Sequence, residues 1–146
     1  MREERIEVLV VGAGPVGLMT ALTLAQGGVE SIIIDREPRT TARSYACALH
    51  PRVLDLLATV GVADDLIAQG RKIESVAFYE KAERRARVRV SDASDKYPFL
   101  LVLPQSVLES TLEARLNVSG SLTRSIRPMT SAIFCQCPMV TIQSTA

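Results

Sequence analysis

The sequence predicts an α/β fold built on a parallel sheet, and three observations support that prediction. Short apolar runs of strand length alternate with stretches of helical apolar spacing, the first run ends in a glycine-rich turn, and an aspartate closes the second run. The chain has 146 residues, 47% of them hydrophobic and 23% charged. This size and composition favour one globular domain and exclude a disordered tail.

Charge and composition exclude several classes of protein. The net charge is +1, Trp is absent and aromatic residues make up 4%, which argues against nucleic-acid and anionic-membrane binding. The three cysteines are odd in number, so we expect a reducing, cytoplasmic location without a disulfide framework. No second pair or nearby His joins Cys135 and Cys137, so we expect no metal. Glycines interrupt the uncharged stretch Val8–Ala25, so we expect no membrane span.

The first elements predict a βαβ unit. Ile6–Val11 and Ser31–Asp35 are apolar runs typical of buried parallel strands. Pro15–Gln26 lies between them and predicts a helix, because proline suits the first helical turn and two glycines follow the last residue. The apolar residues expected on the faces of this helix are Val16, Met19, Ala21, Leu22 and Leu24.

The middle of the chain predicts further helices and strands. The predicted elements are a loop at Glu37–Ala42, helices at Pro51–Val60 and Ala63–Gln69, strands at Ser75–Tyr79 and Arg87–Val90 linked by Glu80–Arg85, a strand at Phe99–Leu103, and a helix at Gln105–Asn117. The arginines between residues 84 and 89 are expected on the wet face of a hairpin. His50 has no nearby acid or nucleophile, so a structural role is expected.

The last 29 residues differ in composition. Val118–Ala146 contains no Asp, Glu or Lys, and nine of its residues are Ser or Thr. No helical or strand period is sustained there. We therefore divide the chain into a body at 1–117 and an atypical tail at 118–146.

The glycine-rich turn carries the clearest functional signal. It follows a predicted strand, opens a predicted helix, and is answered by Asp35 at the end of the next strand, 35 − 17 = 18 residues after its last glycine. Its residues are Gly12, Ala13, Gly14, Pro15, Val16 and Gly17. This pattern predicts a dinucleotide site and leaves NAD and FAD both open.

A physical requirement explains the glycine at each of three positions in the motif. Gly12 permits a tight turn, Gly14 lets a pyrophosphate approach the backbone, and Gly17 allows close packing of helix and strand. The helix N-terminus attracts phosphates. Asp35 accepts hydrogen bonds from ribose hydroxyls and repels a 2′-phosphate, which argues against NADP at this site.

Two later segments add to this signal: IIIDREPRTTARSYACALHPRVLDLLATVG, from Ile32, and YPFLLVLPQSVLESTLEARL, from Tyr97. They resemble the FAD-dependent aromatic hydroxylases, the flavoprotein monooxygenase family of phenol and para-hydroxybenzoate hydroxylases. The resemblance implies FAD as the cofactor, NAD(P)H as a co-substrate and a small phenol-like aromatic substrate. It implies that Arg43 and Gln105 contact the FAD, and Arg36 could lie over the adenine.

The resemblance also defines the expected architecture. It implies a Rossmann-like FAD-binding βαβ unit with a parallel sheet, plus the start of a β-rich substrate-domain portion. The family's later Asp-Gly and Gly-Asp fingerprints are absent, so we expect an incomplete domain from a truncated member, not catalytically competent alone. No catalytic side chain can be named, and the oligomeric state is not predicted. The alternatives are another FAD-dependent oxidoreductase, such as a reductase or halogenase, an NAD-binding module, and a non-catalytic remnant that binds dinucleotide weakly or not at all.

Overall fold

A computed structural model describes residues 3–4, 7–35, 45–90, 95–118, 123–128 and 142–143. The chain divides into two compact units. The first comprises Met1–Thr41 and Leu112–Ala146, and the second comprises Ala42–Thr111.

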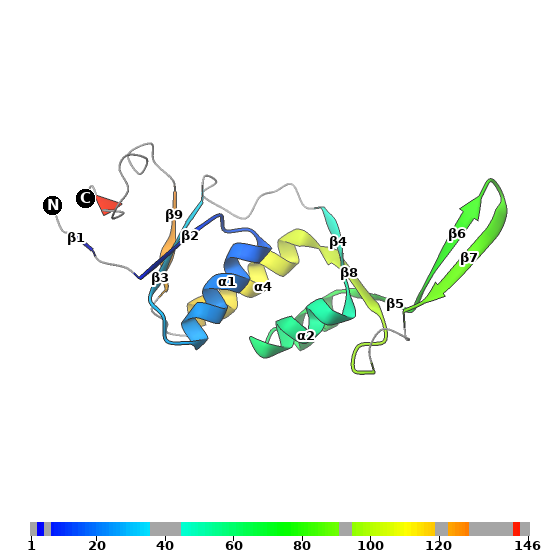
Figure 1. Cartoon of the computed structure of the whole chain (residues 1–146), viewed down its shortest axis with the longest axis horizontal. Coiled ribbons are helices and arrows are strands. Elements are labelled where there is room, and N and C mark those ends of the chain that lie inside the picture. The colour runs from blue at the N-terminus through cyan, green and yellow to red at the C-terminus, as the bar shows by residue number, and fades with distance from the viewer. Residues whose placement is uncertain are drawn as a thin grey trace. The chain divides into compact units, whose positions relative to one another are not determined.

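The first unit is built on a parallel sheet of three strands (Figure 1). Strand β2 (Val8–Val11) pairs with β3 (Ser31–Asp35), which pairs on its other side with β9 (Thr123–Pro128). Strand β3 is therefore central, and its first four residues are buried. This burial explains the unbroken apolar run, because a parallel strand covered on both faces does not alternate with polar residues. The α/β fold with a parallel sheet is confirmed.

Helix α1 (Pro15–Gln26) connects β2 to β3 and packs on both strands. Its buried side chains are Leu18, Ala21 and Leu22, spaced three and four residues apart along one face. Val16, in the first turn of the helix, is 80% exposed and lies outside this packed face. The helix is apolar on several sides, so its periodicity did not indicate which side packs on the sheet.

A short antiparallel pair completes the first unit. Strand β1 (Glu3–Glu4) pairs with β10 (Ile142–Gln143). Strands β9 and β10 both lie within the predicted tail at 118–146.

The second unit contains an antiparallel sheet in the order β4-β8-β5. Strand β8 (Leu100–Pro104) lies between β4 (Ala46–Leu49) and β5 (Arg71–Ile73). Leu101 and Leu103 of the central strand are buried. Helix α4 (Gln105–Val118) begins directly after β8 and continues into the first unit.

Two consecutive helices contribute most of the remaining core of this unit. Helix α2 (Pro51–Thr59) packs against α3 (Ala63–Gln69), and α3 also contacts β8. Fully or nearly fully buried side chains along these helices and their link are Leu54, Leu57, Val60, Val62 and Leu66. The expected structural role of His50 is observed: its Nδ1 accepts a hydrogen bond from the backbone N–H of Arg52 at 3.4 Å, capping α2.

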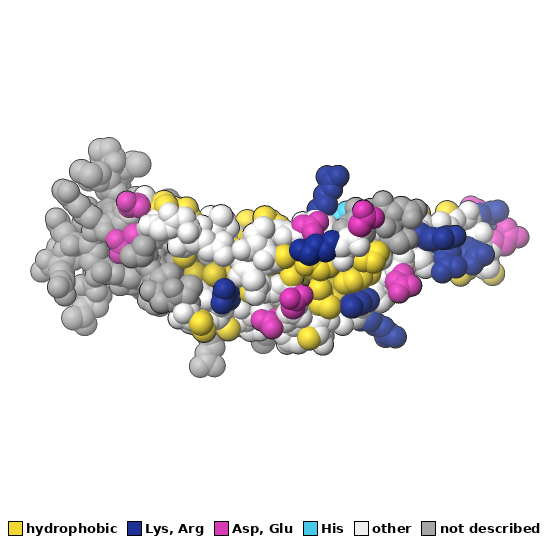
Figure 2. Space-filling model, turned by 90° about the horizontal axis from the view of Figure 1, so that it is seen from below, with side chains coloured by type: hydrophobic (Ala, Val, Ile, Leu, Met, Phe, Trp, Pro, Cys, Tyr) yellow, Lys and Arg dark blue, Asp and Glu magenta, His cyan; other side chains and the backbone are white. Residues whose placement is uncertain are grey.

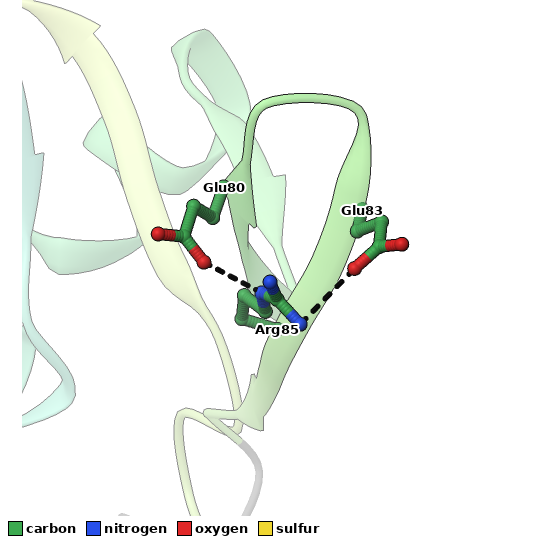
Figure 3. Close-up of polar contacts among 3 residues, drawn as sticks. All are labelled: Glu80, Glu83 and Arg85. Atoms are coloured by element: carbon green, nitrogen blue, oxygen red, sulfur yellow. Dashed lines mark hydrogen bonds and ion pairs between the residues drawn. The ribbon is translucent and has the colours of Figure 1, made fainter.

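Strands β6 (Ser75–Glu80) and β7 (Glu83–Arg89) form a hairpin in the second unit (Figure 1). Every residue of β7 is exposed, and dark blue basic side chains gather on the hairpin in Figure 2. Near its tip, Arg85 donates from Nε to Glu80 at 2.8 Å and lies 3.0 Å from Glu83 through Nη1 (Figure 3). The expected solvated arginine face is therefore confirmed. Ion pairs this exposed contribute little to stability.

The predicted elements agree with the structure at most positions. Helices Pro15–Gln26 and Ala63–Gln69 and strand Ser31–Asp35 begin and end at the predicted residues. The hairpin strands are longer than predicted, because the turn occupies only Lys81 and Ala82. Lys81 has a φ of 55°, a backbone conformation usually signalled by glycine or asparagine. The predicted loop Glu37–Ala42 lies outside the described residues. No helix in the described part of the chain is both long and apolar enough to cross a membrane.

Candidate functional site

The glycine-rich turn lies between strand β2 and helix α1 of the first unit. Strand β2 ends at Val11, helix α1 begins at Pro15, and the intervening residues form the turn. The backbone N–H of Gly12 donates to the carbonyl of Ile34 at 2.7 Å, which extends the pairing of β2 with β3 by one residue. The turn is thus held at the carboxyl end of the parallel sheet, where ligands of open α/β sheets bind.

Two of the motif glycines are required by the protein itself. Gly12 has a φ of +102°, which side chains rarely tolerate. A Cβ on Gly17 would lie 1.8 Å from the carbonyl oxygen of Gly12, so only glycine fits at the contact between helix and turn. These two positions match the roles that the motif predicts for a tight turn and for close packing.

Gly14 differs from both. Its φ is −73°, an ordinary value, and a Cβ placed on it meets no atom of the described residues within 4 Å. Neither backbone strain nor packing against the described part of the chain therefore requires glycine here. The open space above this backbone is what a pyrophosphate needs in order to approach the chain, so the glycine fits a bound dinucleotide.

Gly14 is also the N-cap residue of α1, and no side chain in the described ranges caps this end of the helix. The first backbone N–H groups of a helix lack partners within it, and Pro15 has no N–H to offer. Val16 and Gly17 consequently present their N–H groups at the positive end of the helix dipole. This arrangement suits an anionic ligand.

Asp35 contacts the turn directly. Its Oδ2 accepts a hydrogen bond from the backbone N–H of Ala13 at 2.5 Å, although 22 residues separate the two in sequence. The carboxylate therefore holds the turn against the end of β3. Sequence reasoning assigned Asp35 to ribose hydroxyls and did not anticipate this bond to the protein.

The structure brings only part of the predicted site together. Gly12, Ala13, Gly14, Gly17 and Asp35 lie around one turn of the first unit, with Pro15 and Val16 at the start of α1. Arg36 and Arg43 lie outside the described residues. Gln105 belongs to the second unit, as the first residue of α4.

Gln105 is held at both its backbone and its side chain. Its backbone N–H donates to the carbonyl of Tyr45 at 2.7 Å, and its Nε2 donates to Oε1 of Glu109 at 2.8 Å. Glu109 is only 5% exposed. Sequence reasoning missed Glu109, because a glutamate in an amphipathic helix is usually a surface residue. The only available signal was its position four residues after Gln105, on the same helix face.

Cys47 lies in the same unit, on β4. Its Sγ donates to the carbonyl of Leu103 at 3.4 Å. Burial raises the pKa of the Cys47 thiol and the nearby Glu109 carboxylate raises it further, while a backbone hydrogen bond acts in the opposite direction. The thiol therefore stays protonated near neutral pH, which does not suit a nucleophile. Within the ranges that the structure describes, no three His, Cys, Asp or Glu side chains gather into a metal site.

Fold and turn together define a class of protein, the dinucleotide-binding α/β domains with a βαβ unit and a glycine-rich phosphate turn. Comparison with known proteins identifies the family within that class. The model of the FAD binding domain family matches residues 5–131, and the chain belongs to this family. The match passes Asn117 and includes β9, so the limits of an atypical tail stay a prediction.

Two curated relatives of this chain are named as monooxygenases. The chain is 36% identical over 117 residues to the uncharacterized aromatic compound monooxygenase YhjG of Bacillus subtilis (strain 168), covering 80% of this chain and 23% of the relative. It is 31% identical over 115 residues to pentachlorophenol 4-monooxygenase of Sphingobium chlorophenolicum, covering 78% and 21%. This chain thus spans less than a quarter of either relative.

Solved structures support the same fold. The p-nitrophenol 4-monooxygenase PnpA of Pseudomonas putida DLL-E4 superposes with a TM-score of 0.76 at 28% identity, covering 84% of this chain and 31% of that protein. The flavin-dependent monooxygenase PieE, solved with FAD and substrate, superposes with a TM-score of 0.65 at 25% identity, covering 80% and 22%.

Proposed function

We propose that this chain is the FAD-binding portion of an NAD(P)H-dependent flavoprotein monooxygenase that hydroxylates a phenol-like aromatic substrate. The observation that carries the proposal is the open space at Gly14, a position where the fold itself does not need glycine. Membership of the FAD binding domain family identifies the ligand that suits this space. FAD supplies the redox chemistry of such enzymes, and the protein positions it.

Different site residues would bind different parts of the cofactor. The turn from Gly12 to Gly17, with Ala13, Pro15 and Val16, would receive the pyrophosphate through its backbone and the start of α1. Asp35 would accept hydrogen bonds from the adenosine ribose, and its bond to Ala13 keeps the carboxylate beside the turn. By family resemblance, Arg36 would lie over the adenine, Arg43 would pair with the cofactor, and Gln105 would contact it.

The substrate class rests on the relatives. Pentachlorophenol and p-nitrophenol appear in the names of two of them, and both are phenols. A soluble, reducing cytoplasmic setting is part of the same proposal and agrees with the odd number of cysteines.

The glycine-rich turn is also compatible with other roles. A non-catalytic chain that binds dinucleotide weakly, or another FAD-dependent oxidoreductase such as a reductase or halogenase, would contain the same turn.

Titration of FAD, followed by flavin fluorescence, tests cofactor binding by the chain fused to a soluble carrier protein. We expect saturable binding of FAD, with weaker binding of NAD. No change at millimolar FAD contradicts the proposal, and tighter binding of NAD favours an NAD-binding module. The natural full-length gene product, incubated with phenols, oxygen and NADPH, tests the activity. Hydroxylated product supports the monooxygenase, whereas flavin reduction without oxygen transfer supports the other oxidoreductases.

A further inference from the structure

Two successive N–H groups of the glycine-rich turn are bound by the last two residues of β3. The N–H of Gly12 donates to the carbonyl of Ile34 at 2.7 Å, and the N–H of Ala13 donates to Oδ2 of Asp35 at 2.5 Å. The first acceptor is a backbone group and the second is a side chain. The way in which Ala13 is held therefore depends on the identity of residue 35, whereas the bond of Gly12 does not.

The later N–H groups of the turn have no such acceptor. In the part of the chain that the structure describes, the backbone N–H groups of Gly14, Val16 and Gly17 make no hydrogen bond. Pro15 has no N–H. The three later donors are consequently available to the phosphates of a dinucleotide. They follow Ala13 closely in the chain, so their directions depend on how Ala13 is held.

We propose that Asp35 is a positioning residue for the phosphates, separately from its proposed contact with the ribose. By fixing the N–H of Ala13, its carboxylate keeps the turn in the conformation that presents the three later donors to the ligand. Without this bond, fewer molecules hold the turn in that conformation, and the apparent affinity falls by the same factor. This inference rests on the proposed function, because it takes the turn as the phosphate site.

Two substitutions separate the bond to Ala13 from the charge of Asp35. Asp35→Asn and Asp35→Ala both remove a negative charge that would repel phosphates. The asparagine retains a carbonyl oxygen that accepts from Ala13, whereas the alanine retains no acceptor. A difference between these two variants in phosphate binding therefore reports on the bond and not on the charge.

The test uses an analogue of flavin adenine dinucleotide that lacks both hydroxyls of the adenosine ribose. The analogue retains the pyrophosphate and the flavin, so flavin fluorescence measures its binding to the chain fused to a soluble carrier. We expect Asp35→Ala to bind it at least about fivefold more weakly than Asp35→Asn. Equal affinities overturn the inference, because they show that the bond to Ala13 does not affect phosphate binding.

The matched control is Glu7→Ala. Glu7 is exposed and lies immediately before β2, at the end of the strand opposite to the turn. We expect this variant to bind the analogue as the unaltered chain does. A loss equal to that of Asp35→Ala indicates a general effect of removing an acidic residue from this unit and contradicts the inference.

An NMR readout decides the question even if Asp35→Ala does not fold. In the 15N-labelled, unaltered fusion, we expect the amide proton of Ala13 to lie downfield and to keep its shift when the analogue is added. The amide protons of Gly14, Val16 and Gly17 should instead move. Movement of the Ala13 proton as large as theirs overturns the inference, because its N–H then binds phosphate and not Asp35.

The unaltered chain distinguishes failure of this inference from failure of the proposed function. Binding of FAD without any binding of the analogue overturns the inference, because the phosphates then contribute too little to be positioned. Absence of FAD binding contradicts the proposed function instead, and it does so even where the Ala13 proton lies downfield.

Discussion

The carboxylate of Asp35 accepts a hydrogen bond from the backbone N–H of Ala13 at 2.5 Å, joining the end of β3 to the glycine-rich turn. The residue that the motif assigns to the ribose thus also holds the turn that we propose binds the phosphates. Substitutions of Asp35 should therefore affect both the apoprotein and its ligand affinity, and two variants separate these effects.

We expect Asp35→Ala to destabilise the folded chain by about 1–3 kcal/mol, because it leaves the N–H of Ala13 without its acceptor. Asp35→Asn retains a carbonyl oxygen for that bond and should cost less stability. Both should weaken FAD binding by at least about tenfold, since an amide is a poorer acceptor for ribose hydroxyls than a carboxylate. Pulse proteolysis in urea measures stability and flavin fluorescence measures binding. Equal stability of the Ala and Asn variants would contradict the bond to Ala13.

Substitution by alanine should destabilise the chain at Gly17 but not at Gly14. Gly17→Ala places a Cβ 1.8 Å from the carbonyl oxygen of Gly12, and we expect it to lower the free energy of unfolding by about 3 kcal/mol or more. Gly14→Ala meets no atom within 4 Å and should leave stability unchanged within about 0.5 kcal/mol. Pulse proteolysis in urea compares the two variants, and each is the control for the other.

Gly14→Val tests the ligand site separately from the fold. The backbone of Gly14 is extended and accepts a branched residue, but the side chain fills the space that we assign to the pyrophosphate. We expect FAD affinity to fall by at least about a hundredfold, whereas the apoprotein melts as before. Full FAD affinity in this variant would show that the pyrophosphate lies elsewhere.

The rate at which the Cys47 thiol is alkylated should depend on the negative charge of Glu109. Burial raises the pKa of the Cys47 thiol, a backbone hydrogen bond partly opposes this, and Glu109 adds a smaller increase, so the thiolate is scarce in the folded chain at pH 8. In a background with Cys135→Ser and Cys137→Ser, we expect slow alkylation by iodoacetamide, accelerated by Glu109→Gln. Because the folded pKa is raised, the folded state loses stability as the pH rises above the thiol's unfolded value, and not below it. Unchanged alkylation in Glu109→Gln, with Glu113→Gln as the control, would contradict the electrostatic coupling.

Exposed apolar side chains should make the isolated chain aggregate. Val11 at the end of β2 is 67% exposed, and Phe78 and Val88 of the hairpin are 56% and 53% exposed. Val88 lies opposite Val76 in the hairpin, and Phe78 lies opposite Ala86, so these four residues share one face. We expect Phe78→Ser with Val88→Thr to increase the soluble fraction, while Ala77→Ser on the opposite face changes it little. A monomeric, cooperatively melting preparation of the unaltered chain without a carrier would contradict this expectation.

Local signals account for the parts of the fold that were predicted well. Helix α1 begins at Pro15 and is followed by Gly27, and strand β3 is a continuous apolar run ending at Asp35. Strands β4 and β5 were missed, because ACAL and RKI carry no strand pattern of their own. These segments are strands because each pairs with β8. Pairing between segments that are distant in the chain does not require a strand pattern within either segment.

The sequence by itself determined the βαβ unit, the glycine-rich turn and the resemblance to flavoprotein monooxygenases, because these depend on residues that are near neighbours in the chain. Only the tertiary structure decided which face of α1 packs on the sheet, that Asp35 binds Ala13, and that Glu109 is buried against Gln105. Burial and hydrogen-bond partners depend on which elements meet in space. A helix that is apolar on several sides, or an acid in an amphipathic pattern, is compatible with more than one such arrangement.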